Sequence, residues 1–161
     1  MNAVESALEM AEAVDQQVGR ADVVFGVAAV ADARPAERSA GKPAKAEQAQ
    51  VLTLLPNPDI IAAVAAAGGD RAVVGFALEA PGDLGLEGAL DRARGKLNRK
   101  GLDAIAVNLP SALGAQDSEV VLLFSDGREE HFPRQSKDAT AARLLAAGVE
   151  LWQRKTSSTR E

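Results

Sequence analysis

Residues 22–31 read DVVFGVAAVA, a nearly unbroken apolar run that is rich in valine. Such a run is typical of a central parallel strand that is covered on both faces, because neither face alternates to polar residues. The segments 72–78 (AVVGFAL) and 103–108 (DAIAVN) have the same character. The three runs therefore predict the buried strands of one sheet.

Helical patterns separate these strands along the chain. Residues 4–18 place apolar side chains at helical spacing. Asn57 and Pro58 suit the N-cap and the first position of a second helix. A third helix is predicted to end near Gly101, and Ser136 can cap the last helix.

Two further segments differ from this alternation. Residues 119–124 and 128–132 flank an Asp-Gly turn, which predicts an antiparallel hairpin. Residues 33–50 have no period and contain two prolines, so we expect a mobile loop there. A short strand is predicted to follow over residues 51–55.

The order of these elements predicts an α/β fold with a mainly parallel sheet and right-handed crossovers. The expected architecture is a Rossmann-like three-layer sandwich with an antiparallel hairpin at one edge of the sheet. We expect a single domain over residues 1–153 and a frayed tail over residues 154–161.

The composition limits the classes of function. The chain has 161 residues and a net charge of −5, and aromatic residues make up 3%. Nucleic-acid binding usually needs a basic face or stacking aromatic side chains, so no nucleic-acid partner is expected. No apolar run reaches the roughly 18 residues of a membrane span. The absence of cysteine excludes disulfides and thiolate metal sites. A cytoplasmic location is the default expectation.

Six short motifs follow one another along the chain, and their order is more specific than any one of them. They are AAVAD at 28–32, Lys42 with Lys45, NPDII at 57–61, GFALE at 75–79, KLNRKGLDAIAVN at 96–108 and SK at 136–137. This series resembles the phosphopantothenate–cysteine ligase domain, the C-terminal half of the bacterial bifunctional flavoprotein that makes 4'-phosphopantetheine. The resemblance covers roughly residues 4–150.

The resemblance implies a carbon–nitrogen ligase of coenzyme A biosynthesis that joins 4'-phosphopantothenate to cysteine. In that family a nucleoside triphosphate activates the carboxylate as an acyl-nucleotide, and the amine of cysteine then displaces the nucleotide. The NPDI segment resembles the branch that uses CTP, which implies CTP and Mg²⁺ here, with no protein residue assigned to the metal. Family members are homodimers, which implies a homodimer for this chain.

Asp32 is expected near the carboxyl end of the first strand, where open α/β sheets place their ligand crevices. Its position suits a loop-capping carboxylate and a nucleotide ligand equally, and the resemblance implies the nucleotide. Lys96 and Lys100 are four residues apart and share one helix face. That face is either solvated or bound to a triphosphate, and the resemblance implies a nucleotide site.

The flap and the last parallel strand carry the residues with implied catalytic roles. Lys42 and Lys45 match the outer positions of the family's Lys-Ile-Lys-Lys motif, which reads Lys-Pro-Ala-Lys here. A flap lysine can neutralise charge that develops on phosphate oxygens, although solvated loop lysines are the alternative. The resemblance implies that Lys42 binds the nucleotide and acts in catalysis. Asn108 matches the family's Ala-Asn-Asp triplet, which implies a catalytic role for it too.

Two further motifs are assigned to the nucleotide base by the resemblance. The backbone of the NPDII segment is implied to read the cytosine, whereas plain helix capping explains the same residues without a ligand. Phe76 is implied to lie beside the base, although a single aromatic in a buried strand also suits the core. The implied base-site residues are Asn57, Pro58, Asp59, Ile60, Ile61 and Phe76.

Several departures from the family pattern support a second hypothesis. Leu109 replaces the aspartate of the Ala-Asn-Asp triplet, and Ala80 replaces a threonine. The family's first strand, glycine-rich turn and an asparagine are expected upstream of this chain. We therefore expect it to be active only when paired with a segment that supplies them. The alternative is a non-catalytic nucleotide-binding or scaffold module with the same fold.

Overall fold

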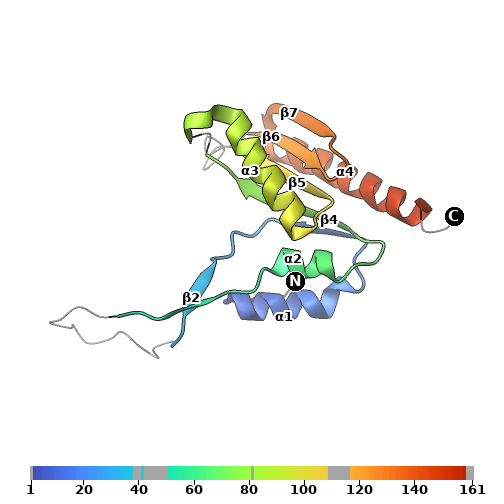
Figure 1. Cartoon of the computed structure of the whole chain (residues 1–161). Coiled ribbons are helices and arrows are strands. Elements are labelled where there is room, and N and C mark those ends of the chain that lie inside the picture. The colour runs from blue at the N-terminus through green and yellow to red at the C-terminus, as the bar shows by residue number, and fades with distance from the viewer. Residues whose placement is uncertain (1, 38–40, 42–50, 81, 109–116, 159–161) are drawn as a thin grey trace.

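The computed structural model describes residues 2–37, 41, 51–80, 82–108 and 117–158. Within these segments, five strands form the main sheet in the order β1-β4-β5-β6-β7 (Figure 1). The pairs β1–β4 and β4–β5 are parallel, and the pairs β5–β6 and β6–β7 are antiparallel. The strands are β1 (Val23–Gly26), β4 (Ala72–Leu78), β5 (Ala104–Asn108), β6 (Asp117–Phe124) and β7 (Glu129–Ser136).

Helices cover both faces of this sheet, which confirms the predicted three-layer architecture (Figure 1). Alternate residues of β4 enter different cores: Val74 joins the core beneath α4, and Val73 joins the core beneath α3. The continuous apolar runs of β4 and β5 are explained by this burial on both faces, whereas the predicted central strand β1 lies at the edge of the sheet and is only half-buried. The helices are α1 (Ala7–Val18), α2 (Ile60–Ala66), the short η1 (Gly82–Leu84), α3 (Gly85–Lys100) and α4 (Lys137–Ser158). None of the helices in the described segments is long and apolar enough for a membrane crossing.

The first strand is shorter than its apolar run. β1 pairs with β4 only as far as Gly26, which lies opposite Gly75, and residues 27–32 then leave the sheet and are exposed. At Gly26 a Cβ atom would lie 2.8 Å from Cδ1 of Ile61, so α2 packs directly on the backbone there. The strand predicted over 22–31 is therefore wrong beyond Gly26, because an apolar pattern does not report how far a partner strand extends.

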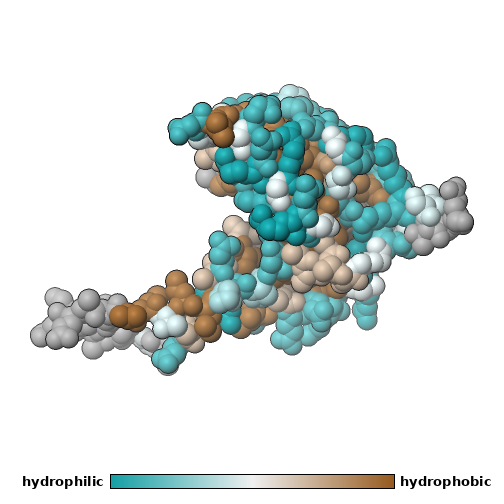
Figure 2. All heavy atoms as spheres, in the orientation of Figure 1, coloured by the Kyte–Doolittle hydropathy of each residue, from teal (hydrophilic) through white to brown (hydrophobic). Residues whose placement is uncertain are grey.

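A separate two-stranded arm extends away from the main body (Figure 1). β2 (Ala33–Pro35) pairs antiparallel with β3 (Leu54–Pro56). The predicted loop is thus wrong at residues 33–35, and the strand predicted over 51–55 begins later than expected. β2 has no local strand pattern, because it forms only through pairing with β3. The arm carries an apolar patch in Figure 2. Leu52 and Leu54 of this region are 66% and 57% exposed.

The C-terminal helix continues further than expected. A frayed tail is predicted over residues 154–161, but α4 continues to Ser158, and residues 159–161 lie outside the described segments. The reason is a tertiary contact at Lys155. Its ammonium lies 2.6 Å from Oδ1 of Asp103 and donates to the carbonyl of Arg71 at 3.0 Å. These contacts tie the end of α4 to the amino ends of β4 and β5.

Replacing Asp103 by alanine is expected to lower the free energy of unfolding by about 1–3 kcal/mol. The carboxylate accepts a hydrogen bond from the N–H of Val73 at 2.8 Å, and Val73 is only 2% exposed. Its loss leaves the buried N–H of Val73 without its acceptor and removes the carboxylate partner of the Lys155 ammonium. Urea denaturation measures the change. Asp103→Asn is the control: it keeps a carbonyl acceptor for Val73, so a loss as large as that of Asp103→Ala would contradict this explanation.

Candidate functional site

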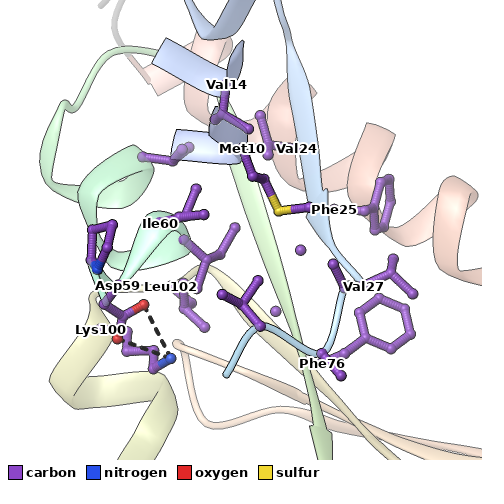
Figure 3. A pocket seen from close by; sticks show the side chains of 18 of the residues that line it. Met10, Val14, Val24, Phe25, Val27, Asp59, Ile60, Phe76, Lys100 and Leu102 are labelled. Carbon is purple, nitrogen blue, oxygen red and sulfur yellow. Dashed lines mark hydrogen bonds and ion pairs between the residues drawn. The ribbon is translucent and has the colours of Figure 1, made fainter. Parts of the chain in front are cut away.

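A cavity of about 1050 Å³ opens at the carboxyl ends of β1, β4 and β5 (Figure 3). The same region appears as a hollow in the molecular surface in Figure 2. This is the edge at which open α/β sheets bind ligands. One part of the wall is apolar and includes Met10, Val14 and Val24, whereas another part carries the charged pair of Asp59 and Lys100 (Figure 3). The cavity therefore offers both apolar contact and charge to a ligand.

The cavity brings together every predicted site residue that the structure describes. Their nucleotide-binding and catalytic roles stay predictions, since their position alone does not identify a ligand. Lys42 lies outside the described segments, as does Lys45. The predicted residues that line the cavity are Asp32, Asn57, Pro58, Asp59, Ile60, Ile61, Phe76, Lys96, Lys100 and Asn108.

Asn57 holds two chain segments together at the cavity. Its Nδ2 donates to the carbonyl of Ala31 at 2.8 Å, and its Oδ1 accepts from Arg34 at 3.2 Å. Its backbone N–H donates to the carbonyl of Asp32 at 2.8 Å. The side chain is thus engaged within the protein, and its observed role is to fix the loop that carries Asp32. The Asp32 residue itself is exposed at the end of that loop.

Asp59, and not Asn57, caps helix α2. Its Oδ1 accepts from the N–H of Ala62 at 3.2 Å, and the helix begins at Ile60. The predicted N-cap at Asn57 and the predicted helical position of Pro58 are therefore wrong, because Asn57 is held by the Ala31 and Arg34 contacts. Asp59 also forms an ion pair with Lys100 of α3, in which Nζ lies 3.0 Å from Oδ2 (Figure 3). This pair links the start of α2 to the end of α3 in the wall of the cavity.

Lys96 forms its ion pair with a different carboxylate. Its Nζ lies 2.7 Å from Oε1 of Glu79, which follows β4 and is 6% exposed. Arg92 donates to the other oxygen of Glu79 at 3.0 Å. Burial raises the pKa of the Glu79 carboxyl, but the close contacts with Lys96 and Arg92 outweigh burial and hold that pKa below its ordinary value. Lys96 and Lys100 therefore share a helix face but have separate anionic partners.

Phe76 lies near the carboxyl end of β4, and Asn108 is the last residue of the neighbouring parallel strand β5. Phe76 is half-buried, packs against the core beneath α4 and also lines the cavity, and its place beside a nucleotide base stays a prediction. The carbonyl of Asn108 accepts from the N–H of Glu79 at 3.0 Å. Its side-chain Oδ1 is buried and accepts no hydrogen bond from the described residues. Leu109, which follows it, lies outside those residues.

Sequence reasoning missed several residues that shape this cavity. Arg34 has no local signal, because its partner Asn57 is 23 residues away. Met10 and Val14 are visible as an apolar helix face, but the pattern does not say that part of that face borders a cavity. Arg92 reads as a solvated helix residue until the fold places it beside Glu79. The only sequence signal for the Arg92–Glu79 pair is the position of Glu79 directly after the apolar run at residues 72–78.

The described residues do not contain a cluster of three histidine, aspartate or glutamate side chains that could hold a metal ion. Asp59 is already paired with Lys100. These residues therefore do not fit a metal site built from protein ligands alone. Mg²⁺ that accompanies a nucleoside triphosphate is held mainly by phosphate oxygens and water, with one or two carboxylates. Such an ion would belong to the substrate.

Comparison with known proteins finds relatives that share one name. The coenzyme A biosynthesis bifunctional protein CoaBC of Mycobacterium tuberculosis (strain ATCC 25618 / H37Rv) is 40% identical over 159 residues, covering 91% of this chain and 37% of the relative. The protein of that name from Vibrio cholerae serotype O1 is 36% identical over 149 residues, covering 88% of this chain and 36% of the relative. The chain therefore spans little more than a third of the length of these relatives.

Solved structures agree with the fold, and a family model covers almost the whole chain. The crystal structure of the C-terminal domain of CoaBC has a TM-score of 0.70 and 26% identity, covering 94% of this chain and 66% of that chain. The DNA/pantothenate metabolism flavoprotein from Streptococcus pneumoniae has a TM-score of 0.74 at 18% identity, with coverage of 94% and 72%, and supports the fold alone. The model of the DNA/pantothenate metabolism flavoprotein C-terminal domain matches residues 1–151. The resemblance inferred from the motifs is thus confirmed, and the chain belongs to the family of the DNA/pantothenate metabolism flavoprotein C-terminal domain.

Proposed function

We propose that this chain carries the nucleotide site of a ligase that joins 4'-phosphopantothenate to cysteine with CTP. The observation that supports this most is the convergence of the motif residues on one cavity at the carboxyl edge of the sheet. Membership of the family agrees with a role in coenzyme A biosynthesis, which is the role named for its relatives. The choice of CTP rests on the NPDI motif at residues 57–60.

The proposed reaction has two steps. A carboxylate oxygen of 4'-phosphopantothenate attacks the α-phosphorus of CTP, which forms an acyl-cytidylate and releases pyrophosphate. The amine of cysteine then attacks the acyl carbon, and CMP leaves as the amide forms and the amine loses a proton. Both steps develop negative charge on phosphate oxygens, so cations placed beside them lower the barrier. Mg²⁺ would enter with the triphosphate and neutralise part of its charge.

The cavity residues divide into charged and base-binding groups in this proposal. Lys96 and Lys100 contact the phosphates, and Lys42 contacts the reacting acyl-phosphate group. Asp32 accepts hydrogen bonds from the nucleotide, and Asn108 orients the acyl group with its buried amide. The backbone of residues 57–61 and the ring of Phe76 contact the cytosine. The carboxylate partners of the two helix lysines hold them beside the cavity, because Glu79 and Asp59 lie within 3.0 Å of them.

The proposed assembly is a homodimer. The arm formed by β2 and β3 is the surface we assign to the partner, because it exposes leucines outside the main core. The family's first strand and glycine-rich turn would come from an upstream segment or from a separate chain. A non-catalytic nucleotide-binding or scaffold module is the second candidate, and the observation that favours it is the change to Ala80 and Leu109 in the motifs.

Calorimetric titration with CTP and Mg²⁺ tests the nucleotide site. We expect CTP to bind more tightly than ATP, and Lys96→Ala and Asp32→Ala to weaken CTP binding. Loss of a charge-assisted phosphate contact corresponds to roughly a tenfold effect or more at Lys96. Arg99→Ala is the matched control, since Arg99 is an exposed cation on the same helix and does not line the cavity.

The outcomes separate the two candidate functions. CTP binding that is weakened in Lys96→Ala and Asp32→Ala but unchanged in Arg99→Ala supports the site, and turnover with the upstream segment restored then supports the ligase. Binding without turnover under those conditions favours the non-catalytic module. A folded wild-type protein that binds no CTP would overturn the proposed site.

A further inference from the structure

Glu79 is a buried charge with two cationic neighbours. The residue is 6% exposed and follows the last residue of β4, and its N–H donates to the carbonyl of Asn108 at 3.0 Å. A buried carboxylate is costly unless it is paired. Here Arg92 and Lys96 of α3 supply the pairing, one on each carboxylate oxygen. Glu79 itself is not among the residues that line the cavity.

The two cations differ in what else they contact. Arg92 donates from Nε to Oε2 of Glu79 and from its guanidinium to the carbonyl of Ala80, and it does not line the cavity. The Arg92 guanidinium is therefore already bound to acceptors within the protein. Lys96 lines the cavity, and its side chain is 40% exposed. A single cation would be enough to neutralise Glu79, so the second one needs another explanation.

The contact of Lys96 with Glu79 leaves the ammonium with donors for a second acceptor. Nζ forms an ion pair with Oε1 of Glu79 at 2.7 Å. An ammonium has three N–H donors. A lysine side chain also loses considerable rotamer freedom when a ligand orders it. A fixed carboxylate behind the ammonium reduces that loss, because the side chain is already held beside the cavity.

We propose that Glu79 is a positioning residue that holds the Lys96 ammonium at the cavity for contact with the phosphates of the nucleotide, while Arg92 keeps Glu79 neutralised from the protein side. This inference rests on the proposed function, in which Lys96 contacts those phosphates. Glu79 acts only through Lys96. Its removal should therefore affect a ligand with phosphates and should have no effect once Lys96 is gone.

The test compares CTP and cytidine binding to the full chain. Glu79→Gln keeps the size of the side chain and loses its charge, and we expect it to weaken CTP binding about three- to tenfold. Cytidine affinity, followed by ligand-observed NMR, should stay within about twofold, because the nucleoside has no phosphate. In the Lys96→Ala background, Glu79→Gln should change CTP affinity by less than about twofold. Thermal unfolding checks that each variant is folded.

Other outcomes would overturn the inference. Equal weakening of CTP and cytidine, or effects of Glu79→Gln and Lys96→Ala that add, would show that Glu79 only supports the fold. CTP binding that falls in Lys96→Ala but not in Glu79→Gln would remove the inference and leave the proposed function intact. A folded wild type that binds no CTP would remove both. If Glu79→Gln does not fold, Glu79→Asp replaces it: the charge stays but is one methylene shorter, and the same loss of CTP affinity is expected.

Discussion

Replacing Leu144 by alanine is expected to lower the free energy of unfolding by about 2–5 kcal/mol. The Leu144 side chain is 5% exposed and belongs to the core between α4 and the sheet. Phe132 and Leu122 of the same core are each 1% exposed. Truncation removes buried apolar surface and leaves a cavity that such neighbours fill only in part. Urea denaturation followed by circular dichroism measures the change, and the denaturant slope should stay constant.

Leu145→Ala is the matched control for this experiment. It makes the same chemical change one residue further along the same helix, but Leu145 is 56% exposed. We expect an effect within about 0.5 kcal/mol, as for most surface substitutions. Equal losses at the two positions would mean that α4 does not pack on the sheet through the face that contains Leu144.

Replacing Gly148 by leucine is expected to lower the free energy of unfolding by about 3 kcal/mol. Gly148 is buried in α4 and faces β1. A Cβ atom at this position would lie 2.7 Å from Cζ of Phe25 and 2.8 Å from Cγ1 of Val23. A leucine therefore forces α4 away from the sheet or displaces Phe25. Because Phe25 also lines the cavity, CTP binding should weaken as well. Urea denaturation and calorimetry report the two effects.

Gly95 provides a contrast within a second helix. It is exposed in the interior of α3, and nothing lies within 4 Å of the position that a Cβ atom would occupy. Gly95→Ala is therefore expected to raise the free energy of unfolding by about 0.5–1 kcal/mol, because alanine loses less backbone freedom on folding. Stabilisation by alanine at both glycines would contradict the close packing of α4 on β1.

The close contact of Gly148 with β1 shows how helix α4 supports the cavity. β1 is an edge strand that is hydrogen-bonded only to β4 within the described sheet. Its other support is side-chain packing, in which Val23 and Phe25 contact the core beneath α4 and Val24 contacts the core beneath α3. The loop that follows β1 carries Asp32. Packing on α4 therefore helps to position one wall of the cavity.

The sequence by itself determined the fold class and predicted a set of residues that the structure places around one cavity. The apolar runs of β4 and β5 could be identified without a structure, because burial on both faces leaves a continuous local pattern. The Asp-Gly turn identified the edge hairpin for a similar reason, since the turn residues lie next to one another. The ordered motifs also predicted ten cavity-lining residues before any geometry was known, and the structure brings them to one edge of the sheet.

Only the tertiary structure decided the partners of those residues. Asn57 holds Ala31 and Arg34 where local rules predict a helix cap, and Asp59 takes the cap instead. Lys96 and Lys100 share a helix face, yet they pair with Glu79 and Asp59, which are 17 and 41 residues away in the sequence. The β2–β3 pairing and the extension of α4 to Ser158 likewise depend on distant contacts. Local patterns record which surface of an element is buried, whereas hydrogen bonds and ion pairs across long loops depend on how the elements are placed in space.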